Sequence, residues 1–168
     1  MKFDGKQLIE IVGTISVVAS LLFVGFQIML ERRVAESEQY QNRARIVIDY
    51  HRSTFENDKF IAETAERYTN LRPTWWNETL ENRINSGASM EAMARAESNW
   101  RMMLFSIDNN YYQYRQGFLE EEMWQANLEI LGDVLSIPMV RATWLSATGI
   151  SAEFKKVLQE TIREIDTE

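Results

Sequence analysis

The feature that most constrains this chain is an uncharged run of twenty residues from Ile11 to Leu30. At about 1.5 Å per residue, a helix of that length spans roughly 30 Å, the thickness of the hydrocarbon core of a bilayer. Because a helix satisfies its own backbone hydrogen bonds where water is absent, the run predicts a single transmembrane helix near the N-terminus. The polar side chains within it are Thr14, Ser16, Ser20 and Gln27.

A cleaved signal peptide is the alternative explanation of this run, because Lys2 and Lys6 precede it. The apolar stretch is longer than the roughly 7–15 residues typical of a signal peptide, and no pattern of small residues marks a cleavage site after it. Arg32 and Arg33 follow at once, as is typical after a segment that stops in the membrane. We therefore expect the helix to be retained in the protein.

The basic residues that flank the run predict its orientation. Two arginines begin the C-terminal flank and two more follow within about 15 residues, whereas the N-terminal side carries two lysines. Because positive charge accumulates on the cytoplasmic side, Arg32 and Arg33 are the expected topology-setting residues. The prediction is an N-terminus outside and a C-terminal domain in the cytoplasm.

The remainder of the chain predicts helices and no strands. Two prolines and seven glycines interrupt the sequence, and no long alternation of apolar and polar residues indicates a strand. The predicted fold class is all-α, with one N-terminal transmembrane helix that continues into a compact helical bundle of about five further helices. The predicted organisation is a short N-terminal tail at 1–6, the transmembrane helix and its extension out of the membrane at 7–56, and an acidic helical domain at 57–168.

Capping residues and helix breakers predict where these helices begin and end. Asp58, Ser89 and Ser151 are candidate N-caps, and Pro73 suits the first turn of a helix. Gly117 suits a left-handed helix end, after which the chain turns back in a tight hairpin. The predicted helices cover 59–70, 73–86, 90–116, 119–136 and 152–165, with a short helical segment at 138–145.

The distal domain is acidic, and the chain has no cysteine. Residues 57–168 carry 11 Lys or Arg and 18 Asp or Glu side chains, which leaves a net charge of −7. A domain of that sign repels phosphate backbones, so we expect no nucleic-acid partner. The lack of cysteine excludes disulfides, thiol catalysis and Cys-ligated zinc.

The predicted transmembrane helix carries a polar stripe. At 100° per residue, Gly13, Ser16, Ser20 and Gln27 fall within a sector of about 60°, and the rest of the circumference is mostly large and apolar. Small residues allow close approach of two helices, and Ser or Gln can hydrogen-bond across the contact, which favours an association face. The alternative is that the serines bond to carbonyls of their own helix and Gln27 reaches toward the membrane surface.

Patterns that carry catalysis or bind cofactors are missing from the sequence. His51 is the only histidine, and we expect a partly buried hydrogen-bonding residue, with a pH sensor as the alternative. No glycine-rich phosphate loop occurs, and the acidic triplet Glu120–Glu122 suits the positive end of a helix dipole better than a metal site. We therefore predict a protein that is not an enzyme, with no catalytic residue, no cofactor and no metal.

Aromatic residues form two groups in the distal domain. The group around Trp100, Tyr111 and Trp124 has helical spacing, which favours a buried core. Trp75 and Trp76 are adjacent and cannot share one helix face, so core packing and an exposed aromatic contact remain open for them.

Segments 8–33 and 99–124 carry a family resemblance. The second contains Asn99-Trp100 and the run NYYQYRQGFLEEEMW at 110–124. Together they resemble a widespread group of uncharacterised bacterial single-span membrane proteins, which have a short N-terminal membrane helix and a helical domain with a Tyr-Tyr-Gln-Tyr-Arg-x-Gly segment. Phe118 stands where that group has Leu. The resemblance implies this architecture in a bacterial inner (cytoplasmic) membrane and supplies no catalytic or binding residue.

The residues of this segment suit a structural corner. Tyr111 and Arg115 are four apart on a helix and can stack, Asn110 can reach Tyr114, and Gly117 turns the chain. The segment is therefore predicted to hold two helices at a fixed angle.

These observations favour a membrane-anchored, non-catalytic interaction or assembly subunit. Its expected partners are the lipid bilayer and other transmembrane helices, either in a homo-oligomer or in a larger membrane complex that it serves as an accessory subunit. A small oligomeric channel or sensor lined by Ser16, Ser20 and Gln27 is the alternative. A membrane-associated enzyme ranks below both.

Overall fold

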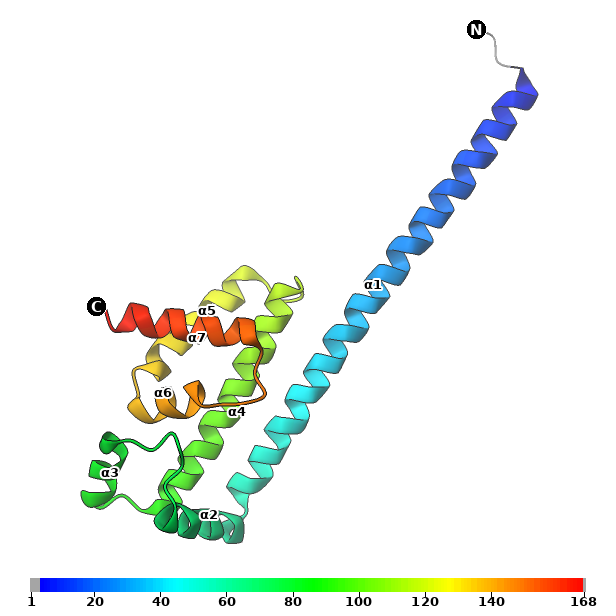
Figure 1. Ribbon diagram of the computed structural model, residues 1–168. Helices are drawn as coiled ribbons and strands as arrows, with labels where there is room; N and C mark the ends of the chain where they lie inside the picture. The colour runs from blue at the N-terminus through cyan, green and yellow to red at the C-terminus, as the bar shows by residue number, and fades with distance from the viewer. Residues whose placement is uncertain (1–3, 168) are drawn as a thin grey trace. The chain divides into compact units, whose positions relative to one another are not determined.

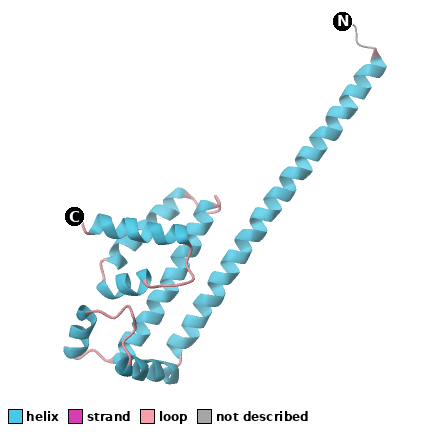
Figure 2. Cartoon of the chain, in the orientation of Figure 1, coloured by secondary structure: helices cyan, strands magenta, loops and turns pink. Residues whose placement is uncertain are grey.

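The computed structural model describes residues 4–167, which form seven α-helices and no strand (Figure 1, Figure 2). The predicted all-α class is confirmed. Six helices follow the first rather than about five, because the short segment that begins at Pro138 is a complete helix with proline in its first turn. The helices are α1 (Gly5–Glu56), α2 (Asp58–Asn70), α3 (Glu78–Asn85), α4 (Met90–Arg115), α5 (Glu121–Leu135), α6 (Pro138–Leu145) and α7 (Ala152–Ile165).

The chain divides into two compact units, residues 1–39 and residues 40–168, and α1 contributes residues to both. In the first unit, the apolar side chains between Leu8 and Leu30 are exposed. Among the described residues, α1 is the one helix that is long and apolar enough to cross a membrane, judged by length and composition, and none of its apolar window is buried. This segment is therefore a candidate membrane span.

Helix α4 is the central element of the second unit (Figure 1). It packs against α2, α5 and α6, and α7 packs against α5 and α6. Helix α6 contributes to both buried clusters of this unit, with Met139 in one and Trp144 in the other. The indole Nε1 of Trp144 on α6 donates to the carbonyl of Trp100 at the middle of α4, 3.0 Å away. One buried cluster contains Ile61, Tyr68, Trp75, Leu80, Met93, Ala94 and Met139. The other contains Leu104, Ile107, Trp124, Leu131, Val134, Leu135, Val140, Trp144, Ala147, Phe154 and Leu158.

Side-chain caps set the beginning of four helices in this unit. The predicted caps Ser89 and Ser151 accept hydrogen bonds from the backbone N–H groups of Ala92 and Phe154, each at 3.1 Å. The prediction for α2 was wrong by one residue, because Asn57 accepts from Phe60 N–H at 3.1 Å and Asp58 is already helical. Helix α2 therefore begins on an asparagine cap.

The prediction that Pro73 opens the third helix was also wrong. The carbonyl of Pro73 accepts from the N–H of Trp76 at 2.9 Å, which closes a turn before the helix. Asn77 then caps α3 by accepting from Leu80 N–H at 3.1 Å. Proline at position 73 is compatible with a turn as well as with a helix start. The helix begins after Asn77 because the side chain of Asn77 caps it.

Helix α4 ends in a Schellman motif at Gly117, which has a φ of 77°. Phe118 N–H donates to the carbonyl of Gln113 and Gly117 N–H to that of Tyr114, each at 2.9 Å. These two bonds satisfy carbonyls that the end of the helix would leave unpaired. The chain then turns into α5.

Two glycines in this region give a matched test of backbone conformation. An added Cβ meets no atom within 4 Å at either Gly117 or Gly132, but Gly117 alone has a positive φ. We predict that Gly117→Ala lowers the free energy of unfolding by about 1 kcal/mol, because an L-residue is strained in the left-handed region. Gly132→Ala inside α5 should raise it by roughly 0.5–1 kcal/mol.

The measurement is urea unfolding of the purified full chain in detergent, followed by tryptophan fluorescence. Equal effects of the two substitutions would contradict a left-handed requirement at Gly117.

Candidate functional site

The predicted association face lies on the part of α1 that belongs to the first unit, where the side chains are exposed. In the single chain, the Ser16 hydroxyl donates to the carbonyl of Val12 and the Ser20 hydroxyl to that of Ser16, both at 2.8 Å. Gly13 and Gln27 are exposed, and a Cβ added at Gly13 would meet no atom within 4 Å. The serines therefore have the bonds within their own helix that the alternative interpretation requires.

The predicted topology-setting residues are also exposed. Arg32 forms an ion pair with Glu36 one turn later, with Nε and Oε1 2.9 Å apart. Arg33 is exposed on the same helix.

The predicted structural corner at the end of α4 contains the expected contact between Tyr111 and Arg115, but not the expected contact between Asn110 and Tyr114. Arg115 lies over the ring of Tyr111 at 5.9 Å and donates to its hydroxyl at 3.1 Å. Tyr114 stacks on Trp124, with ring centroids 5.5 Å apart, and the ring of Tyr111 lies 5.2 Å from the same indole. The Tyr-rich end of α4 thus packs on α5.

The sequence predicted a contact between Asn110 and Tyr114, but in the structure the side chains of both residues bond to α5. The amide of Asn110 donates to Asn127 Oδ1 at 3.0 Å, and the hydroxyl of Tyr114 donates to Glu121 Oε2 at 2.6 Å. This hydrogen bond raises the pKa of the Tyr114 phenol and lowers that of the Glu121 carboxyl. Glu121, from the acidic triplet, therefore serves the α4–α5 contact.

An exposed aromatic contact at the adjacent tryptophans is wrong for Trp75. Its side chain is 8 % exposed and belongs to the core around α2 and α3. Trp76 is half-buried: the guanidinium of Arg72 lies 4.7 Å from its ring, and its Nε1 donates to Glu81 Oε2 at 2.7 Å. Arg72 also donates to both carboxylate oxygens of Glu81, each at 3.0 Å. Arg72, Trp76 and Glu81 therefore hold the segment between α2 and α3 against α3.

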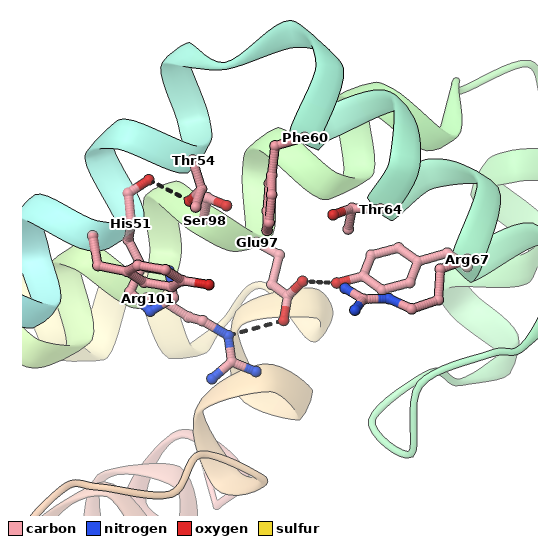
Figure 3. Close-up of a pocket in the computed structure, with 10 residues that line it drawn as sticks. His51, Thr54, Phe60, Thr64, Arg67, Glu97, Ser98 and Arg101 are labelled. Carbon is pink, nitrogen blue, oxygen red and sulfur yellow. Dashed lines mark hydrogen bonds and ion pairs between the residues drawn. The ribbon is translucent and has the colours of Figure 1, made fainter.

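A polar pocket of about 150 Å³ lies where the end of α1, α2 and the first half of α4 meet (Figure 3). Its lining includes the carboxylate of Glu97 and the guanidinium groups of Arg67 and Arg101, and Figure 3 shows the ion pair between Glu97 and Arg101. All three contributing segments belong to the second unit. The lining is Tyr50, His51, Thr54, Phe60, Thr64, Arg67, Tyr68, Glu97, Ser98 and Arg101.

Glu97 is the buried charge of this pocket, with 8 % of its surface exposed. One carboxylate oxygen accepts from the hydroxyl of Tyr68 on α2, and the other accepts from Arg101 Nε one turn later on α4, at 2.9 Å. Burial, followed by the negative charge and hydrogen bond of Glu97, raises the pKa of the Tyr68 phenol. Both carboxylate oxygens are therefore occupied by protein donors.

His51 borders the pocket from α1 and is half-buried. Its contacts are with rings, since Tyr50 lies 5.3 Å and Phe105 6.1 Å from the imidazole centroid. Burial lowers the pKa of the imidazole, and the nearby positive charge of Arg101 lowers it further, while Glu97 opposes the shift. These effects together favour the neutral imidazole.

A second buried carboxylate, Asp108, lies further along α4 with 3 % of its surface exposed. It accepts from the hydroxyl of Tyr40 on α1 at 2.8 Å, and from the hydroxyl and N–H of Ser151 at 2.9 and 3.3 Å. Burial and the bond to Asp108 raise the pKa of the Tyr40 phenol. Tyr40 also stacks on Tyr112 with a centroid separation of 3.9 Å, so α1 is joined to α4 at this end as well.

Sequence reasoning missed Glu97 and Asp108, although a signal was present. Met93, Glu97, Leu104 and Asp108 are separated by four, seven and four residues, which places the two carboxylates on the apolar stripe of α4. A charge on a buried stripe needs partners, and Tyr68 and Tyr40 supply them. The pocket offers hydrogen-bond donors rather than a free carboxylate, and residues 4–167 contain no cluster of His, Cys, Asp and Glu arranged to hold a metal ion.

Comparison with known proteins yields no family: no protein-family model, curated protein or solved structure matches this chain.

The lowered pKa of His51 predicts an acid-side loss of stability. The unfolded state takes up a proton near pH 6.5, whereas the folded state resists it until a lower pH, so the contribution of His51 is complete above about pH 6.5 and is lost as pH falls below it. We predict that His51→Gln removes this part of the slope between about pH 7.5 and 5.

The measurement is the free energy of unfolding of both proteins across that range. Parallel curves for the wild-type protein and His51→Gln would contradict a depressed pKa at this position.

Proposed function

We propose that this protein is a membrane-anchored, non-catalytic interaction subunit. In this proposal the apolar part of α1 spans a bacterial inner membrane once, with the N-terminus outside, and the helical domain stays in the cytoplasm as a docking module. The observation that carries it is the exposed apolar surface of α1. The folded unit at 40–168 has its own two buried clusters and needs no help from that surface.

The cost of leaving α1 in water supports a lipid environment. Fifteen large apolar side chains between Leu8 and Leu30 are exposed. At about 1.5–3 kcal/mol for each such side chain, their transfer out of water is worth at least roughly 20 kcal/mol. That exceeds the stability of about 5–15 kcal/mol typical of a whole domain, so a bilayer or a partner must cover this surface.

The polar stripe supports association of α1 with other transmembrane helices. Gly13 offers an open surface for close approach, and Ser16 and Ser20 lie on the same face. Arg32 and Arg33 then mark the cytoplasmic end of the span. The partner helix is either a second copy of this chain or a component of a larger membrane complex.

Anchoring is tested by alkaline carbonate extraction of membranes. We predict that the intact protein stays in the membrane pellet, because its apolar run is too long and too hydrophobic to leave the bilayer. A variant with Leu21→Lys and Leu22→Lys should move to the soluble fraction or fail to reach the membrane. Release of the wild-type chain by carbonate would overturn the proposal.

Association is tested by the assembly mass in mild detergent. Ser16→Leu combined with Ser20→Leu should lower the mass, because the bulky side chains prevent close approach at the stripe. Val18→Leu is the matched control, since residue 18 lies about 180° away around the helix and its substitution should leave the mass unchanged. A strictly monomeric wild-type protein with no co-purifying partner would remove the support for association.

A further inference from the structure

Two hydroxyls in the pocket lined by α1, α2 and α4 have no protein partner. Thr64 is 7 % exposed and Ser98 is 8 % exposed, yet neither side chain forms a hydrogen bond to any residue that the structure describes. Neighbouring helical threonines behave differently: Thr69 donates to the carbonyl of Ala65 at 2.9 Å, and Thr143 to that of Met139 at 2.9 Å. Neither oxygen is among the fully enclosed side-chain atoms that lack a partner, so both hydroxyls open onto the pocket, where water or a polar group of a ligand can bond to them.

The charges around these hydroxyls favour an anion. Arg67 and Arg101 supply two positive charges to the lining, and Glu97 supplies one negative charge. This excess is opposite in sign to the whole chain, which carries −7. A concave lining with a net positive charge attracts anions.

The two guanidinium groups have unused donors within the described chain. Arg101 uses its Nε on Glu97, which leaves its terminal N–H groups without a hydrogen bond to residues 4–167. Arg67 contacts the ring of Tyr68 at 5.7 Å and forms no side-chain hydrogen bond there. A guanidinium presents its donors in a planar fork that matches a carboxylate.

The size and walls of the pocket set the rest of the ligand. Its volume of about 150 Å³ equals that of a protein cavity that takes up benzene, so it admits more than a single small ion. The rings of Tyr50, Phe60 and Tyr68 supply flat apolar walls, and the imidazole of His51, whose pKa is lowered, adds a ring without charge at neutral pH. The lining therefore combines a flat apolar part with an anion-binding part.

We propose that this pocket binds a small organic carboxylate with a flat, ring-sized apolar body. Arg67 and Arg101 face its carboxylate, the hydroxyls of Thr64 and Ser98 donate to it, and the aromatic walls cover its body. The bound molecule touches three helices at once, so binding stabilises the domain by linkage. This site is independent of the membrane anchor, and its failure would leave the proposed anchoring unaffected.

The experiment uses the purified full chain in detergent and sodium benzoate as the probe. Benzoate should raise the midpoint of thermal unfolding in a concentration-dependent way, while sodium chloride at equal ionic strength and benzyl alcohol at equal concentration should not. Arg67→Met should weaken benzoate binding by about tenfold, because a charge-assisted hydrogen bond is lost. Arg163→Met, an exposed arginine on α7, is the matched control and should bind like the wild type.

The hydroxyls separate ligand binding from a structural role. Thr64→Val and Ser98→Ala should keep or raise the midpoint of unfolding without benzoate, because each removes a hydroxyl that has no protein partner, and both should weaken the response to benzoate. A lower midpoint without ligand would overturn the assignment by showing a structural bond. So would a response to phosphate but not to benzoate, or equal responses of Arg67→Met and Arg163→Met.

Discussion

One buried carboxylate, that of Asp108, joins three separate segments of the helical domain. It accepts from Tyr40 at the start of the α1 segment in this unit, and from Ser151, which also caps α7. Hydrogen bonds to a charged group are worth roughly 1.5–3 kcal/mol each, and a lost partner leaves a buried charge. The carboxylate therefore joins the α1 segment at 40–56 to the domain and positions the start of α7, and that α1 segment supplies Tyr50, His51 and Thr54 to the pocket.

The start of a helix was predicted correctly where the sequence offers one capping residue. It was predicted wrongly where two nearby residues can each begin the helix. Ser89 and Ser151 are capping residues without a rival, and both cap as expected. Asn57 stands directly before Asp58, and Asn77 follows Pro73 by four residues, so each stretch holds two residues that can begin a helix. The structure uses asparagine both times. For Asn57 and Asp58, sequence spacing does not predict which residue caps the helix, because asparagine and aspartate stabilise a helix start by nearly the same free energy.

The pocket was beyond sequence reasoning because its parts come from distant positions. Glu97 and Tyr68, which meet in its lining, are 29 residues apart in the sequence. An acidic residue on a helix is usually solvated, and only the packing of α2 on α4 shows that Glu97 is enclosed. Trp75 illustrates the same point, since its neighbour Trp76 has the same residue type and a different environment.

The hydrogen bonds of the polar stripe on α1 do not by themselves account for the association of two helices. In the single chain, the hydroxyls of Ser16 and Ser20 already bond to carbonyls of their own helix. A bond across two helices would replace those bonds rather than add to them, and such interhelical bonds average about 0.6 kcal/mol. At this average, two serines contribute about 1 kcal/mol to a helix pair. Close packing at Gly13 and contacts made by the tethered domain must supply the rest, so the affinity of the proposed assembly rests mainly on shape and on the domain.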